Sequence, residues 1–332
     1  MANRNKDPIY TLTAYDDAFR TMESECNDIL IPFVNYMFGE NYSMDDVVIR
    51  MRNEHFISQP GRKRRKRITD SYFKIVHDGI SKDYHLECES SLYDKTILVR
   101  IFEYDSQIAL DSGYSMYDDN APVSDISRLN ICFPNSGLVE LRSNSNTPDS
   151  ATITLNTPGG SVNYNIPIIR VNDFTIEKIF DNKLYLLIPF YIFKHEDELN
   201  DINSNEDKTD DLVKTYDKIM DLLHIENQNG RLSTQSLNVI IQLTESVLHK
   251  LTMKYESVQK KVGDLMGGKV IMLPEIVAMR KAREQVYKEV EDERKENEKY
   301  RRESEKYHRE SQAEIKALRE ENERLKAQLA MS

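Results

Sequence analysis

The residues best suited to chemistry lie in a short segment that alternates like a β-strand. In residues 84–89, apolar side chains alternate with His85, Glu87 and Glu89, so one side of the strand carries an imidazole and two carboxylates. Paired acids of this kind are ordinarily explained by a solvated face on an edge hairpin. Carboxylates that gather at one point, however, are the usual ligands of hard divalent cations.

A second strand-like segment, residues 68–75, precedes the first and contains Asp70 near its beginning. The Asp-Gly turn at residues 77–79 predicts that the two segments pair as an antiparallel hairpin. Asp70 and Glu87 then converge at one end of the ribbon and form an oxygen-rich site suited to Mg²⁺ or Mn²⁺. A divalent ion held there can activate water and neutralise the charge that develops on a phosphodiester.

These segments resemble the PD-(D/E)XK nucleases, and in particular the Rpn group of recombination-promoting nucleases and putative transposases. That pattern has an Asp at the start of one strand, and an acid, any residue, and Lys or Gln on the next. Asp70 and Glu87 stand at the positions of the two acids, and Glu89 stands at the position of Lys or Gln.

The resemblance extends beyond the hairpin. Residues 15–20 are similar to the opening helix of the family, which makes Asp17 a candidate third acid, and residues 101–105 and 187–191 continue the likeness over the first 195 residues. The resemblance implies an α+β fold with a restriction-endonuclease core, which is a mixed sheet flanked by helices. It also implies hydrolysis of DNA phosphodiester bonds, linked to recombination or mobile elements.

The resemblance also implies roles for individual residues. Asp70 and Glu87 would hold Mg²⁺ or Mn²⁺, with the main-chain carbonyl of Cys88 as a further ligand and Asp17 as a supporting acid. Whether the substrate is DNA or RNA, and whether strand transfer accompanies hydrolysis, stays open at this point.

Glu89 departs from the pattern, because an ionised carboxylate cannot supply the cation or amide of that position. Glu89 is either a further metal ligand or an acid kept protonated by its acidic neighbours. Lys74, on the same strand side as Asp70, could provide the missing cation. If none of these holds, the chain is a catalytically silent nuclease-fold module that binds DNA or a partner.

A run of basic residues directly precedes the Asp70 strand: Arg62, Lys63, Arg64, Arg65, Lys66 and Arg67. Such a run either contacts the phosphate backbone of a nucleic acid or remains a solvated loop. Its position before the acidic site favours phosphate contact. Since the 332-residue chain has a formal net charge of −11, contact with DNA must come from such a local patch.

Three isolated cysteines, without metal-binding spacing, indicate neither a disulfide framework nor a zinc site. The sequence has no signal-like or membrane-spanning run, so we expect a cytoplasmic protein without a membrane partner.

Helical periodicity predicts a first helix from residue 15 to Gly39, which continues past Pro32, and another over residues 94–110. From the latter helix, Arg100 and Gln107 either reach the site or pair with solvent or a neighbouring acid. Strands are predicted at residues 131–133, 138–141, 152–155, 166–169 and 184–188, with a hairpin turn at 156–160.

The chain divides by composition into a nuclease-like domain at 1–195, an acidic linker at 196–211, a helical segment at 212–268 and a charged tail at 269–332. The tail has the composition of a long solvent-exposed helix or of a coiled coil, and Asn322 falls in the apolar seam of the latter. A buried Asn at such a position favours a parallel, two-stranded pairing, so we expect a homodimer.

Overall fold

The computed structural model describes residues 14–51, 54–57, 65–68, 70–115 and 131–267. The predicted coil at 269–332 and the first part of the basic run, residues 62–64, lie outside the described residues. None of the described helices is both long and apolar enough to cross a bilayer.

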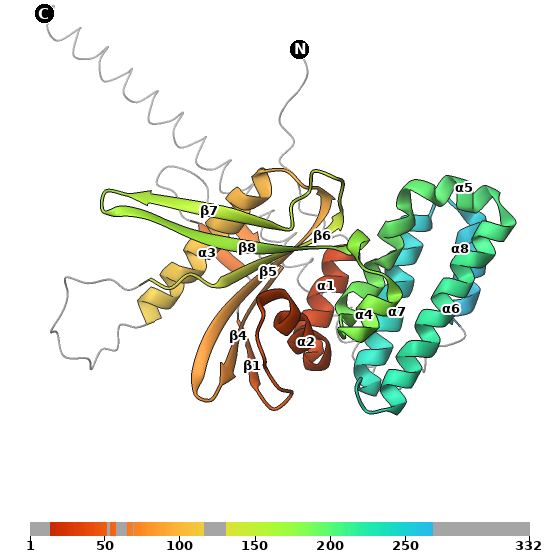
Figure 1. Ribbon diagram of the computed structural model, residues 1–332, viewed down its shortest axis with the longest axis horizontal. Coiled ribbons are helices and arrows are strands. Elements are labelled where there is room, and N and C mark those ends of the chain that lie inside the picture. The colour runs from red at the N-terminus through yellow and green to blue at the C-terminus, as the bar shows by residue number, and fades with distance from the viewer. Residues whose placement is uncertain (1–13, 52–53, 58–64, 69, 116–130, 268–332) are drawn as a thin grey trace, which may run out of the picture. The chain divides into compact units, whose positions relative to one another are not determined.

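A mixed six-stranded sheet forms the centre of the protein (Figure 1). In spatial order its strands are β1 (Val47–Arg50), β4 (Ser71–His77), β5 (Ile80–Leu92), β6 (Asn135–Arg142), β8 (Gly160–Arg170) and β7 (Ser150–Thr157). The pairs β5–β6 and β6–β8 are parallel, and the other neighbours are antiparallel. A separate two-stranded sheet consists of β2 (Glu54–Ile57) and β3 (Arg65–Ile68). The predicted α+β class, with a mixed sheet flanked by helices, is confirmed.

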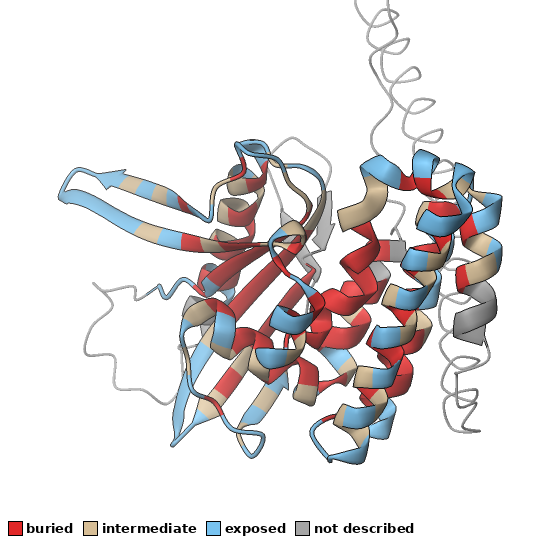
Figure 2. Cartoon of the chain, turned by 45° about the vertical axis from the view of Figure 1, so that its right-hand side comes forward, coloured by how far each residue is buried: buried red, intermediate tan, exposed pale blue. Residues whose placement is uncertain are grey.

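The helices lie on both faces of the sheet. They are α1 (Ala14–Glu25), α2 (Asn27–Phe38), α3 (Thr96–Ser115), α4 (Ile176–Asp181), α5 (Leu199–Ser204), α6 (Glu206–Gln228), α7 (Thr234–Thr252) and α8 (Glu256–Gly267), with 3₁₀ turns η1 (Val171–Asp173) and η2 (Tyr185–Glu198). Leu86 of β5 packs into the large core formed with α1 and α2, whereas Leu138 of β6 packs with Ile101 of α3. Figure 2 shows the resulting buried interior of the sheet.

The hairpin between β4 and β5 forms as predicted, with His77 paired to Ile80 across a tight turn. Asp78 and Gly79 have φ angles of 48° and 78°, the left-handed conformations that a two-residue hairpin turn requires and that Gly adopts without strain. The register places Ser71 opposite Leu86, so Asp70 lies immediately before β4 at the end of the ribbon.

The predicted first helix is broken at Cys26, where φ is −127° and ψ is 88°, into α1 and α2. Pro32 lies inside α2 and does not end it, and Gly39 closes the helix in the left-handed conformation with φ 68°. The predicted helix over residues 94–110 is confirmed as α3.

Two predicted strands are wrong. In the predicted strand at 184–188, all residues after Leu184 belong to the 3₁₀ segment η2, since a short, continuously apolar run fits a buried helix as well as a buried strand. Residues 131–133 precede β6, which begins only at Asn135. The hairpin turn between β7 and β8 is confirmed at Pro158 and Gly159.

The acidic stretch at 196–211 is helical, in contrast to the predicted linker: it covers the end of η2, all of α5 and the start of α6. Its few apolar residues, including Leu199 and Ile202, are buried, and their packing overrides the polar composition of the stretch. One hydrophobic core extends from Tyr15 to Val262, so the C-terminal helices form one compact unit with the sheet.

Candidate active site

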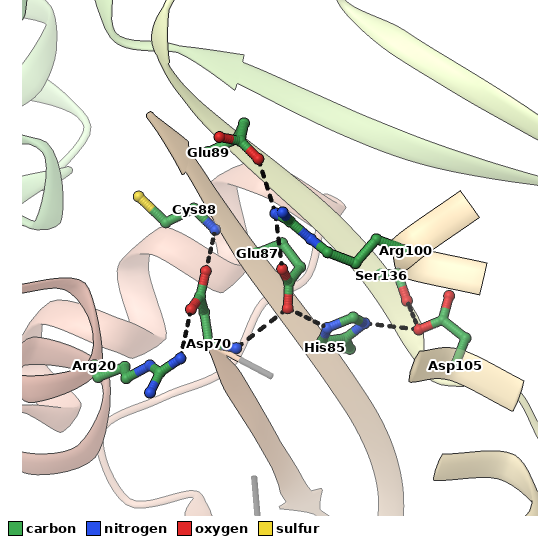
Figure 3. Close-up of polar contacts among 9 residues, drawn as sticks. All are labelled: Arg20, Asp70, His85, Glu87, Cys88, Glu89, Arg100, Asp105 and Ser136. Carbon is green, nitrogen blue, oxygen red and sulfur yellow. Dashed lines mark hydrogen bonds and ion pairs between the residues drawn. The ribbon is translucent and has the colours of Figure 1, made fainter. Parts of the chain in front are cut away.

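Asp70 and Glu87 lie together where β4 begins, and each carboxylate accepts a hydrogen bond from the neighbouring chain segment (Figure 3). The N–H of Asp70 donates to Oε1 of Glu87 at 3.1 Å, and the N–H of Cys88 donates to Oδ2 of Asp70 at 3.0 Å. Asp70 is 7% exposed and Glu87 is 2% exposed. The structure therefore brings together the two acids that the sequence predicts to converge.

An arginine from each face of the sheet pairs with these acids (Figure 3). Arg20 of α1 donates to Oδ1 of Asp70 at 2.9 Å. Arg100 of α3 lies 3.2 Å from Oε2 of Glu87 and 2.9 Å from Oε2 of Glu89. Every carboxylate oxygen of Asp70 and Glu87 thus faces a donor of the chain itself.

The charges of the two central acids are coupled. Burial, and next the negative charge of Glu87, raise the pKa of Asp70, and Arg20 offsets only part of this rise. Burial also opposes the charge of Glu87, but the hydrogen bond and charge of His85, together with Arg100, outweigh it and lower the pKa of Glu87. Glu87 is consequently the acid that ionises first.

The cation beside Glu89 comes from Arg100 and not from Lys74. Lys74 pairs with Asp83 at 3.3 Å, further along the hairpin, and Gln107 hydrogen-bonds within α3. The sequence offers Arg100 as a residue able to reach the site from this helix, and the structure shows that it does. Glu89 also accepts a hydrogen bond from the main chain of its own strand, at 2.8 Å.

Behind Glu87, the site continues into the protein through His85. Nε2 of His85 lies 3.0 Å from Oε1 of Glu87, and Nδ1 lies 2.7 Å from Oδ1 of Asp105. The hydroxyl of Ser136 donates to the same oxygen of Asp105 at 2.7 Å. Burial by itself lowers the pKa of His85, but its hydrogen bonds to Asp105 and Glu87 outweigh this effect and raise the pKa to about 10.

Glu140 is a residue of this region that the sequence-based reasoning missed. It is fully buried on β6 and pairs in register with Glu89 on β5. Burial, and next the charge of Glu89, raise the pKa of Glu140 to about 8. A signal was present in the sequence, since Glu140 is a lone acid in the apolar run Leu-Val-Glu-Leu.

Helix α1 contains two acids of interest, Asp17 and Glu23, and only the side chain of Glu23 is among the described residues. Asp17 lies in α1, but its side chain is outside the described residues. Glu23, two turns further along, is 2% exposed, and burial raises its pKa to about 7 although Arg50 lies 3.8 Å away. Glu23 lies one turn from Arg20, on the helix that carries the partner of Asp70.

The last part of the basic run, residues 65–67, forms most of β3 and pairs antiparallel with β2, with His55 opposite Arg67. This part is a strand and not the loop that the charge pattern indicates. It ends shortly before Asp70, so the basic segment leads directly into the acidic site.

Within the described parts of the chain, no group of three or more His, Cys, Asp or Glu side chains could hold a metal ion. Asp70 and Glu87 do have the donor chemistry that Mg²⁺ uses, because this ion commonly takes one or two carboxylates and completes its shell with water and substrate phosphate. The guanidinium groups of Arg20 and Arg100 would have to move from the oxygens they now face.

Comparison with protein-family models, with curated proteins and with solved structures returned no match to this chain. The fold and the site geometry define an α+β protein with a mixed sheet and a nearly buried pair of acids, each of which pairs with an arginine.

Proposed function

We propose that this protein is a metal-dependent DNA endonuclease of the PD-(D/E)XK type, similar to the Rpn group linked to recombination and mobile elements. One observation carries the proposal. The N–H groups of Asp70 and Cys88 hold the carboxylates of Glu87 and Asp70 side by side at the end of the hairpin. Two hard ligands fixed in this way are what metal-assisted phosphodiester hydrolysis requires of a protein.

Asp70 and Glu87 would hold Mg²⁺ or Mn²⁺, with Asp17 as a supporting acid. An ion held there would act as a Lewis acid, which would lower the pKa of a water molecule and neutralise charge on the phosphate. Arg100 takes the part that Lys or Gln has in the family, because its planar guanidinium can contact a phosphate while Glu89 orients it. Arg20 orients Asp70 through their ion pair.

The basic segment at 62–67 would bind the DNA backbone next to the acids, since each Lys or Arg that meets a phosphate releases counterions. The tail at 269–332 would join two chains in a parallel coil. Two sites held together can cut both strands of a duplex. We expect such a protein to act in the cytoplasm, without a membrane partner.

A second function is favoured by a specific observation, namely that all four oxygens of Asp70 and Glu87 already face donors of the chain. With Glu89 in place of Lys or Gln, the domain would then be a catalytically silent module that binds DNA or a partner.

Incubation of the purified protein with supercoiled plasmid and Mg²⁺ or Mn²⁺ separates the two functions. We expect cleavage that Asp70→Asn and Glu87→Gln each abolish, whereas Glu177→Gln, which alters an exposed ion pair with Lys218, leaves it unchanged. Calorimetric titration with Mn²⁺ should show a site that the same two variants lose. DNA binding without cleavage would identify the silent module, and cleavage that survives Asp70→Asn would exclude this site.

A further inference from the structure

Three buried side chains extend the site behind Glu87 and are not among the proposed metal ligands. They are His85 on β5, Asp105 on α3 and Ser136 on β6, which are 0%, 0% and 3% exposed. Hydrogen bonds of 3.0, 2.7 and 2.7 Å link Glu87 to His85, His85 to Asp105, and Asp105 to Ser136 (Figure 3). Three separate elements thus contribute to one chain of contacts that ends on Glu87.

The chemistry of the partners determines the direction of these bonds. A carboxylate only accepts hydrogen bonds, so Asp105 accepts from Ser136 and from Nδ1–H of His85. Glu87 likewise accepts from Nε2–H of His85. Both ring nitrogens of His85 therefore face an acid, so the imidazole is held from two sides. Tyr104 packs edge-on against this ring, with centroids 5.8 Å apart and planes at 79°, and restricts its rotation.

The hydrogen bond from His85 determines which oxygen of Glu87 faces the site. Oε1 accepts from His85 and from the N–H of Asp70, so two buried donors occupy it. Oε2 instead faces the guanidinium of Arg100, and that side chain is 31% exposed. Oε2 is consequently the oxygen on the accessible side of the carboxylate.

We propose that Asp105 and His85 are positioning residues, which hold the Glu87 carboxylate in one orientation and present Oε2 to a divalent cation. This inference rests on the proposed function of Glu87 as a metal ligand. Partners in the outer shell of a metal site act in this way, and their loss typically costs about 10- to 100-fold in metal affinity.

The test uses the full-length protein with Asp105→Asn and His85→Gln, and with Tyr164→Phe as the matched control. The Tyr164 hydroxyl donates to the other oxygen of Asp105 at 3.4 Å, so this control perturbs Asp105 without breaking the contact to His85. Mn²⁺ affinity is measured by calorimetry, and circular dichroism establishes that each variant is folded. We expect both test variants to lose about 10- to 100-fold in affinity and the control to match the parent.

A second readout does not involve the metal. In the metal-free parent, two-bond ¹H–¹⁵N spectra of the histidines should contain a His85 signal, assigned by its loss in His85→Gln. Asp105→Asn should shift the Nδ1 resonance of this signal, because the carboxylate that faces Nδ1 is replaced by an amide. If Asp105→Asn does not fold, Ser136→Ala should shift the signal and lower Mn²⁺ affinity in the same direction, but less.

The outcomes are distinguishable. Parent-like Mn²⁺ affinity in a variant whose His85 signal has changed would overturn the positioning role and leave the proposed function intact. An unchanged His85 signal in Asp105→Asn would overturn the hydrogen bond itself. A parent with the expected His85 signal but no Mn²⁺ binding would refute the proposed metal site, and the positioning role with it.

Discussion

Glu140 lies directly across from Glu89 in the parallel pairing of β6 with β5, and neither oxygen of Glu140 has a hydrogen-bond partner among the described residues. Glu140 is fully buried, whereas Glu89 is held in an ion pair with Arg100. Two neighbouring carboxylates, only one of which is paired, resist simultaneous ionisation. Ionisation of Glu140 therefore destabilises the protein when the solution is made alkaline.

Glu140→Gln should reduce the dependence of stability on pH. The pKa of Glu140 rises from 4.5 to about 8 on folding. The contribution of this group to the stability of the fold is therefore fully present below pH 4.5 and is lost as the pH rises through about 8. At about pH 9 the variant should be more stable than the parent by ~1–3 kcal/mol, and at about pH 4.5 the two should be alike.

Urea unfolding at both pH values measures the effect. The variant should still lose part of its stability as the pH rises, because burial also raises the pKa of Glu23 and Asp70. A fall with pH as steep as that of the parent would show that Glu140 does not ionise in this range.

Arg100→Gln should lower plasmid cleavage by about 10- to 100-fold, the loss expected for a charge-assisted hydrogen bond of ~1.5–3 kcal/mol. Lys74→Gln should leave cleavage unchanged, because Lys74 pairs with Asp83 away from the acids. Initial rates under saturating Mn²⁺ make the comparison. The reverse order of the two variants would assign the missing cation to Lys74.

Replacement of residues 65–67 by Ala should weaken DNA binding for unrelated sequences alike. The slope of log affinity against log salt should flatten by about 0.9 for each phosphate that the variant no longer binds. Ala at Lys208, Lys214 and Lys218 of α6, which changes the net charge equally, provides the control. Equal slopes in both triple variants would mean that β3 does not touch DNA.

Asp28→Ala should destabilise the protein by ~1.5–3 kcal/mol, since a charged group that receives hydrogen bonds is removed. Asp28 of α2 accepts hydrogen bonds from the N–H of Ser233 at 2.8 Å and from the hydroxyl of Ser236. It therefore stabilises the position of the N-terminal end of α7 against α2. Chemical denaturation measures the loss, and Ala at the exposed Asp197 serves as reference. Equal midpoints for the two variants would refute this role.

Asn322→Leu should strengthen self-association and relax its specificity, giving trimers or mixed registers, because a buried Asn selects the two-stranded pairing at some expense of stability. Light scattering of the parent, the variant and a chain that ends after α8 measures the masses. If the shortened chain keeps the mass expected of a dimer, association does not depend on the tail.

The sequence by itself determined the local geometry of the site. Alternation around His85, Glu87 and Glu89, together with the Asp-Gly turn, specified a hairpin, because side-chain period and turn conformation depend on neighbouring residues only. The apolar stripe of α3 was predictable for the same reason. The break at Cys26 and the 3₁₀ form of residues 185–188 were not, since a local apolar pattern specifies neither.

Tertiary structure alone decided which partners the acids have. Arg20 pairs with Asp70, Arg100 pairs with Glu87, and Asp105 pairs with His85. These contacts form only because α1 and α3 cover opposite faces of β5. Glu140 becomes a neighbour of Glu89 only through the parallel pairing of β5 with β6. Such contacts depend on how whole elements pack, so the spacing of residues along the chain does not specify them.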